Sequence, residues 1–313
     1  MELQELAKDV YTCLQEDKGL GWSNSGLVNR GGGLVVDTFW DLPHTRELIA
    51  TYGKVRSTPA QRVVNSHDNG DHSWGNQLFP QAEIIGHRLC AEQMKGQDPA
   101  ALQRRKVAAQ RGDPALAPLA EAFGAWDFSG IEITPPTTLL EDRLELNLDG
   151  TTVEIIYVGP AHSVGDVIVH LPDERVVFTG DILFWLCTPI GWDGTFENWS
   201  LALDRIVELD PAVVVPGHGP LCGVEGPKEM KAYLAYVRSE AQDHYQAGRS
   251  VVDAAKRIDL GPYAGWTEPE RIVINVARAY REFQGRPFDA PLDPQANFET
   301  MFSLRKEGAF VWS

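Results

Sequence analysis

The sequence lacks paired cysteines, an excess of basic residues and long apolar runs. Its four cysteines are scattered and none forms a C-x-x-C pair, so we expect buried free thiols in a reducing compartment. Acidic residues outnumber basic ones by 44 to 28, and the net charge of −16 argues against a groove that binds nucleic acid. No apolar run approaches the roughly 20 residues of a membrane span, and residues 1–5 are acidic and polar rather than a cationic leader. We therefore expect a cytoplasmic protein without membrane or nucleic-acid partners.

The remaining composition is that of a globular protein. Hydrophobic residues make up 43% and charged residues 23% of the 313 residues, which argues against disorder. The β-branched segments bounded by glycine predict strands, and the longer apolar-periodic segments predict helices. Strands are expected at residues 9–14, 25–29, 33–37, 62–66, 83–86, 144–148, 152–157, 167–171, 175–178 and 212–215, and helices at 45–52, 199–209, 228–246, 251–258 and 268–283.

The order of these elements predicts one layered α/β domain with a helical extension. Residues 1–225 would form the α/β domain, interrupted by a helical insertion at about residues 88–135. Residues 226–313 would form helices packed on the same domain. The apolar stripes of these helices would belong to the core, cap a pocket or form the surface of a homodimer.

The most informative stretch is His67-Asp68-Asn69-Gly70-Asp71-His72. Four of its six residues can hold a metal, and it directly follows the apolar run at residues 62–66, which predicts a strand. Imidazole and carboxylate groups at such close spacing suit a borderline cation such as Zn²⁺.

Three further candidate ligands follow other predicted strands. His162 lies in a Gly-Pro-Ala-His-Ser segment, Asp181 follows Phe-Thr-Gly, and His218 is flanked by glycine and proline. Small and turn-forming neighbours let the backbone approach closely, so these side chains can converge on one point.

This set resembles the metallo-β-lactamase-fold hydrolases, whose signature is H-x-H-x-D-H followed by a lone His, a bridging Asp and a final His. The resemblance covers roughly residues 8–222. It implies an αββα four-layer sandwich, in which two similar halves deliver ligands from strand ends. In relatives with two metal ions, the first site corresponds here to His67, Asn69 and His162, and the second to Asp71, His72 and His218, with Asp181 bridging.

Asn69 departs from the signature, because it stands where the second His belongs. An amide oxygen is a poorer zinc ligand than imidazole. We therefore expect one firmly held Zn²⁺ at Asp71, His72, Asp181 and His218. Two alternatives remain for His67 and His162: they hold a second, weak ion, or they only hydrogen-bond the loop. Asn69 could contact the metal, although we favour donation of its amide hydrogen to substrate or to a developing oxyanion.

The resemblance implies a catalytic zinc-bound hydroxide, since coordination lowers the pKa of water from about 16 to roughly 7. Asp71 would orient this nucleophile, and His67 or Asn69 would steady the attacked group. Large aromatic side chains near the ligand-bearing strand ends predict a hydrophobic pocket, and residues 184–196 are the best candidate for a substrate-contacting loop. The expected pocket residues are Trp22, Trp40, Trp74, Phe184, Trp185 and Trp192.

The predicted function is hydrolysis of a small, rather hydrophobic substrate by a zinc enzyme. Esters, lactones, thioesters, lactams and haloaromatics all fit, because a fold alone does not select the substrate. The first rival is a non-haem iron oxidoreductase of the same fold, resembling persulfide dioxygenases, with Asp181 and two His as iron ligands. The second rival is a non-catalytic binding protein that kept the fold.

Overall fold

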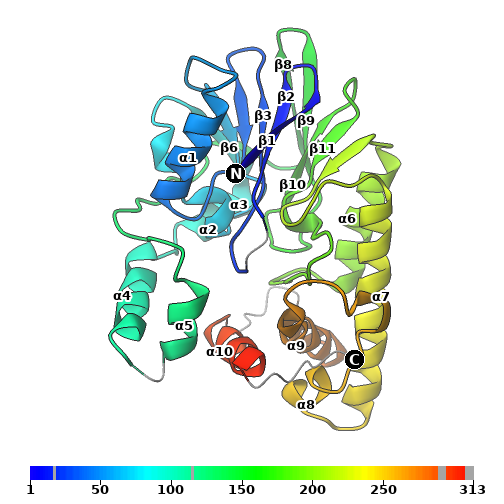
Figure 1. Cartoon of the computed structure of the whole chain (residues 1–313). Coiled ribbons are helices and arrows are strands. Elements are labelled where there is room, and N and C mark those ends of the chain that lie inside the picture. The colour runs from blue at the N-terminus through cyan, green and yellow to red at the C-terminus, as the bar shows by residue number, and fades with distance from the viewer. Residues whose placement is uncertain (17–18, 114–115, 288–293, 307–313) are drawn as a thin grey trace.

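Two β-sheets packed face to face form the centre of the structure (Figure 1). The computed structural model describes residues 1–16, 19–113, 116–287 and 294–306. The first sheet has the order β1-β2-β3-β4-β5-β6-β7, antiparallel up to β4 and parallel from β4 to β7. The second has the order β12-β11-β10-β9-β8, in which only β11 and β12 are parallel.

The bounds of the strands match most of the expected segments. The first sheet comprises β1 (Glu2–Ala7), β2 (Val10–Leu14), β3 (Ser25–Val28), β4 (Leu34–Val36), β5 (Arg62–Val64), β6 (Glu83–His87) and β7 (Thr138–Leu140). The second comprises β8 (Arg143–Leu148), β9 (Thr151–Tyr157), β10 (Val167–Leu171), β11 (Val176–Phe178) and β12 (Val213–Val215).

Apolar side chains fill the space between the sheets and cover both outer faces. Val64 of the first sheet and Phe178 of the second belong to one buried cluster between them. The outer face of the first sheet packs on α1 (Leu42–Tyr52), and that of the second on α6 (Phe196–Glu208) and α7 (Glu225–Gln246). Each fully buried Val, Leu or Ile contributes about 1.5–3 kcal/mol. The four layers confirm the predicted αββα sandwich.

Three elements were not expected from the sequence. Strand β1 is an edge strand whose polar Glu-Leu-Gln-Glu segment is mostly exposed, so it carries no buried alternation. Strand β7 has only three residues. Helix α10 (Pro294–Lys306) is only weakly amphipathic, although Met301, Phe302 and Leu304 are buried. Short or weakly patterned elements are fixed by tertiary packing, which periodicity does not report.

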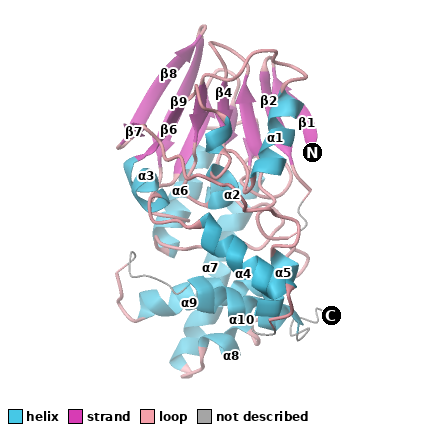
Figure 2. Cartoon of the chain, turned by 90° about the vertical axis from the view of Figure 1, so that its left-hand side faces the viewer, coloured by secondary structure: helices cyan, strands magenta, loops and turns pink. Residues whose placement is uncertain are grey.

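The segment between β6 and β7 forms α3 (Arg88–Met94), α4 (Pro99–Gln110) and α5 (Ala117–Ala122). Helices α4 and α5 lie below the first sheet, on the side of the C-terminal helices (Figure 2). The predicted helical insertion therefore begins at the expected place, but an irregular chain rather than a helix leads from α5 to β7.

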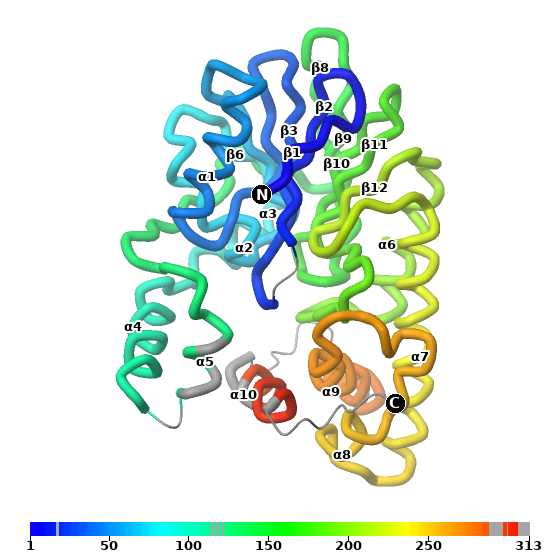
Figure 3. Tube along the Cα trace, viewed as in Figure 1, coloured from blue at the N-terminus to red at the C-terminus, as the bar shows by residue number. Residues whose placement is uncertain are grey.

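The C-terminal segment is helical, with α7 followed by α8 (Val251–Ala255), α9 (Ile272–Phe283) and α10. Helix α7 packs on both α6 and α9, which joins this segment to the second sheet. Helix α10 lies between α9 and α5, so the two helical regions meet below the sandwich (Figure 3). Within the described residues, no helix is both long and apolar enough to cross a membrane.

Candidate metal centre

The motif residues 67–72 follow β5 as a loop that enters the single-turn helix α2 (Gly70–Ser73). Gly70 packs so tightly that an added Cβ would lie 2.6 Å from the rings of Trp40 and Trp74. A glycine is therefore required here, and it lets the turn approach the aromatic wall while presenting Asp71 and His72 on the other side.

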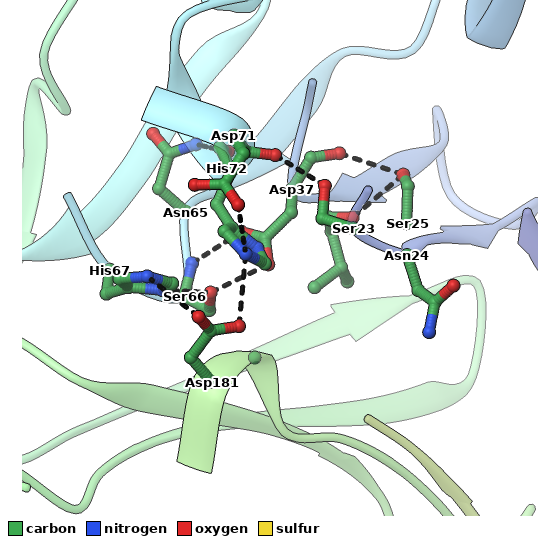
Figure 4. A network of polar contacts seen from close by, with 12 residues as sticks. Ser23, Asn24, Ser25, Asp37, Asn65, Ser66, His67, Asp71, His72 and Asp181 are labelled. Carbon is green, nitrogen blue, oxygen red and sulfur yellow. Dashed lines mark hydrogen bonds and ion pairs between the residues drawn. The ribbon is translucent and has the colours of Figure 1, made fainter. Parts of the chain in front are cut away.

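Two loops from the second sheet complete the centre. Asp181 lies in a single 3₁₀ turn (Gly180–Ile182) after β11, and His218 follows β12. The Gly217 N–H donates to the Gly180 carbonyl at 2.8 Å, which ties the two loops together. Figure 4 shows Asp181 reaching from the second sheet toward His67 and His72 of the first.

Four donor atoms meet at spacings suited to one tetrahedral ion. Asp181 Oδ1 lies 3.1 Å from His72 Nε2 and 3.3 Å from His218 Nε2. The two imidazole Nε2 atoms are 3.4 Å apart. Asp71 Oδ2 lies 3.4 Å from His218 Nε2 and 3.8 Å from His72 Nε2. Ligands bound tetrahedrally at about 2.0–2.1 Å are separated by about 3.3–3.4 Å.

Hydrogen bonds on the far side of each ring aim these imidazoles at the centre. His72 Nδ1 lies 3.0 Å from Asp37 Oδ2, and His218 Nδ1 lies 3.0 Å from the Trp22 carbonyl oxygen. Because both partners only accept, each Nδ1 keeps its proton, and each Nε2 is the atom that can lose a proton and present a lone pair to a cation. Asp181 Oδ1 is buried without a hydrogen-bond partner among the described residues. This donor set fits a divalent cation.

A second group of donor atoms surrounds the other oxygen of Asp181. Asp181 Oδ2 lies 3.5 Å from His162 Nε2 and 3.8 Å from His67 Nε2. Asn69 Oδ1 lies 2.9 Å from His162 Nε2 and accepts a hydrogen bond from Trp192 Nε1 at 3.0 Å. The structure therefore brings all six predicted ligands and Asn69 together.

Electrostatics divides the four imidazoles into two pairs. Burial lowers the pKa of His67 to about 4 and that of His162 to about 3. Burial acts likewise on His72 and His218, but the adjacent Asp181 and Asp71 outweigh it. They raise the pKa of His72 well above its usual value and that of His218 to about 9. In the metal-free protein, His72 and His218 therefore hold the protons that a cation would replace.

A cavity of about 500 Å³ opens onto these groups. Trp40, Trp74, Phe184 and Trp192 line it, as predicted for the pocket. Trp22 and Trp185 are not among its lining residues, which corrects the expectation for these two. The Trp22 ring packs on His44 and Trp126, and the Trp185 N–H donates to the His218 carbonyl. Both tryptophans lie on loops near a metal ligand, as expected, but they stabilise these loops and do not line the cavity.

Several cavity residues were missed from the sequence. Gln97 follows α3, where its Oε1 accepts a hydrogen bond from Trp74 Nε1 and its Nε2 donates to Asp68. Phe298 of α10 lines the cavity and packs on Trp192 with ring centroids 5.3 Å apart. Neither residue lies near a motif, so only the tertiary structure reveals them.

One face of α9 and the residue before it hold two segments of main chain, at residues 188–193 and at Ala161. Four side chains at spacings of four, three and three residues donate to main-chain carbonyls. Arg271 donates to Thr188, Asn275 to Pro189, Arg278 to Ala161, and Arg281 to Trp192 and Asp193. The segment at residues 188–193 in turn supports His162, whose Nδ1 donates to the Ile190 carbonyl at 2.6 Å. The C-terminal helices thus form part of the centre.

Comparisons with known proteins agree with this geometry. A family model described as the metallo-beta-lactamase superfamily matches residues 19–218. The 2,4-dinitroanisole O-demethylase subunit alpha of Nocardioides sp. is 30% identical over 191 residues, which cover 60% of this chain and 49% of that protein. The linear primary-alkylsulfatase of Pseudomonas sp. is 24% identical over 319 residues, covering 87% of this chain and 58% of that protein. The chain thus spans about half the length of these two relatives.

Among solved structures, the stereoselective inverting sec-alkylsulfatase from Pseudomonas sp. matches with a TM-score of 0.64 at 17% identity. The match covers 93% of this chain and 51% of that one. At this identity, the likeness concerns the fold.

Proposed function

Because the chain belongs to the metallo-beta-lactamase superfamily, we propose that it is a metal-dependent hydrolase with one firmly held zinc ion. The ligands would be Asp71, His72, Asp181 and His218. The substrate would be a small, mainly apolar molecule with an ester, lactone, thioester, lactam or haloaromatic group. The observation that carries this proposal is the set of five spacings, between 3.1 and 3.8 Å, among the four donor atoms.

A bound cation would supply a water nucleophile at neutral pH, because coordination lowers the pKa of water to about 7. Asp71 is the ligand most open to the cavity, with 15% of its side chain exposed. We assign it to orienting the water through the carboxylate oxygen that does not face His218. Asn69 also lines the cavity, and its Nδ2 group would donate to the substrate oxygen that gains negative charge. His67 is only 1% exposed and does not line the cavity, so its side chain is not placed to contact a substrate there.

The cavity favours an uncharged aromatic substrate. Its aromatic side chains offer ring-stacking surfaces. Arg271 is the one arginine or lysine among the described residues that line it, and this side chain already pairs with Glu268 and donates to the Thr188 carbonyl. An anionic group would also meet the carboxylates of Asp68 and Asp193. The relative named for acting on 2,4-dinitroanisole, an aromatic ether, supports this preference.

The test begins with the metal content of protein purified without added metal. We expect about one zinc per chain and hydrolysis of at least one member of a panel of aryl esters, lactones, thioesters, lactams, haloaromatics and aryl methyl ethers. Asp71→Ala should abolish this activity, whereas Asp243→Ala, at an exposed position on α7, should retain it. Stoichiometric iron with oxygen uptake would replace the proposal by an iron oxidoreductase. Full activity of Asp71→Ala would refute the assigned centre, and absence of both metal and turnover would favour a binding protein.

A further inference from the structure

A second cavity lies on the outer face of the first sheet. Its volume is about 390 Å³, which falls within the roughly 300–1,000 Å³ that is typical of ligand pockets. Its lining residues come from β3, β4, the C-terminal end of α1 and two loops, at residues 56–60 and 78–81. None of these residues also lines the cavity at the metal centre, so the two cavities are distinct.

The walls of this second cavity are mainly apolar. Leu27 and Val35, which pair between β3 and β4, contribute aliphatic side chains from the sheet, and Leu78 contributes another from its loop. Ile49 of α1 also lines the cavity, although 36% of this residue is exposed. An apolar chain bound here would remove this surface from water, which is favourable. Among the described residues that line the cavity, none is acidic.

Arg56 is the one basic residue among these lining residues, and the loop between β3 and β4 holds its guanidinium in place. Nη1 donates to Asn29 Oδ1 at 3.0 Å, and Nη2 donates to the Gly32 carbonyl at 2.5 Å. The guanidinium also packs closely on Gly33, where an added Cβ would lie 2.6 Å from Arg56 Nε. Both hydrogen-bond acceptors are neutral, so they orient the guanidinium without compensating its charge.

The charge of Arg56 has no carboxylate partner among the described residues, although acidic residues outnumber basic ones by 44 to 28 in this chain. Burial lowers the pKa of Arg56, and no neighbouring acid offsets this effect. The Nε–H group is buried and has no hydrogen-bond partner within the described part of the chain. A half-buried cation beside apolar walls is stabilised by an anion, because the charge and the unused donor are then both compensated.

We infer that this cavity binds an aliphatic monocarboxylate, with the carboxylate beside Arg56 and the hydrocarbon chain against the aliphatic walls. A single guanidinium that already uses two of its nitrogens suits one negative charge better than a phosphate dianion, which needs more donors. Ser57 and Thr58 also line the cavity, and each offers a hydroxyl that can donate to the bound carboxylate. The inference depends on neither the metal centre nor the proposed function.

The first test compares ligands that differ in chain length or in charge. Full-length protein, as purified, is titrated by calorimetry with butanoate, hexanoate, octanoate and 1-octanol. Affinity should rise about fourfold per added methylene group until the cavity is filled. Octanoate should bind about tenfold more tightly than 1-octanol, because a hydrogen bond to a charged group is the stronger one. Equal affinity for octanoate and 1-octanol, or no binding of octanoate, would overturn the inference.

The second test locates the carboxylate. Arg56→Met should weaken octanoate binding about tenfold and leave 1-octanol binding unchanged, whereas Arg56→Lys keeps the charge and should retain most of the affinity for octanoate. Lys54→Met is the matched control, because Lys54 is exposed nearby and does not line the cavity. Circular dichroism establishes that each variant is folded. If folded Arg56→Met binds octanoate like the wild type, the carboxylate binds elsewhere, for example at the metal, and the inference is wrong.

Discussion

Asp37→Asn should weaken zinc binding without removing any ligand. The Asp37 carboxylate is buried at the end of β4 and accepts three hydrogen bonds. These come from the Ser66 N–H at 2.7 Å, the Ser66 hydroxyl at 2.7 Å and His72 Nδ1 at 3.0 Å. An asparagine has only one oxygen, so its NH₂ group must face one side of this set. Because the Ser66 N–H needs the oxygen, the NH₂ group would face the Ser66 hydroxyl and His72 Nδ1.

His72 would then accept at Nδ1 and carry its proton at Nε2, the atom that faces Asp181 and Asp71. Loss of such a supporting group costs about 10–100-fold in metal affinity, which corresponds to about 1.4–2.7 kcal/mol. Mispairing of buried groups would also lower the free energy of unfolding by about 1–3 kcal/mol.

The assay is a calorimetric zinc titration of the metal-free variant, with circular dichroism to establish that it is folded at the assay temperature. Asp243→Asn, on the exposed surface of α7, is the control and should bind zinc like the wild type. If folded Asp37→Asn binds zinc as tightly as the wild type, the argument that Asp37 selects the His72 proton position is refuted.

Three further predictions concern the same centre. A Cβ on Gly217 would lie 2.1 Å from Asp181 Oδ1, so Gly217→Ala should lower zinc affinity at least about tenfold; Gly265→Ala, which meets nothing within 4 Å, should not. Arg278 is fully buried, donates from Nη2 to the Ala161 carbonyl and pairs through Nε with Glu282 at 4.0 Å, so Arg278→Met should lower both the thermal midpoint and turnover; an unchanged midpoint would contradict this. The carboxylates beside His218 raise its pKa from 6.5 to about 9 in the metal-free protein. Protonated His218 therefore stabilises the folded metal-free protein fully below about pH 6.5, and this stabilisation is lost as the pH rises toward about 9. Scanning calorimetry should show the metal-free midpoint falling across that window, and a flat profile would count against it.

The sequence predicted those features that recur along the chain or form a known pattern. Strands β2 to β6 and β8 to β12 alternate apolar and polar residues or are rich in β-branched residues, so they can be predicted from the sequence alone. The ligand set was recognisable because each member follows a strand and has small neighbours. Edge strand β1 was not predicted, because its side chains are mostly exposed and its sequence therefore shows no apolar periodicity.

Residues that act through main-chain contacts were invisible in the sequence. Arg278 donates to a carbonyl 117 residues earlier in the chain, and no spacing rule links such positions. Trp185, expected in the pocket, does not line the cavity, and its contact with the centre is the hydrogen bond from its backbone N–H to the His218 carbonyl. Asn69 was recognised as a departure from the pattern, but its partner Trp192 lies 123 residues away. Hydrogen-bond geometry was needed to connect the two.

The hydrogen bonds from α9 to main-chain carbonyls have a consequence for how the sequence of this protein can diverge. Because every residue type supplies the same carbonyl, the hydrogen bond that Arg281 donates to the Asp193 carbonyl does not depend on the side chain at position 193. Single replacements of Asp193 therefore change the lining of the cavity without loss of this hydrogen bond, and a library randomised at this position should keep folded members at high frequency.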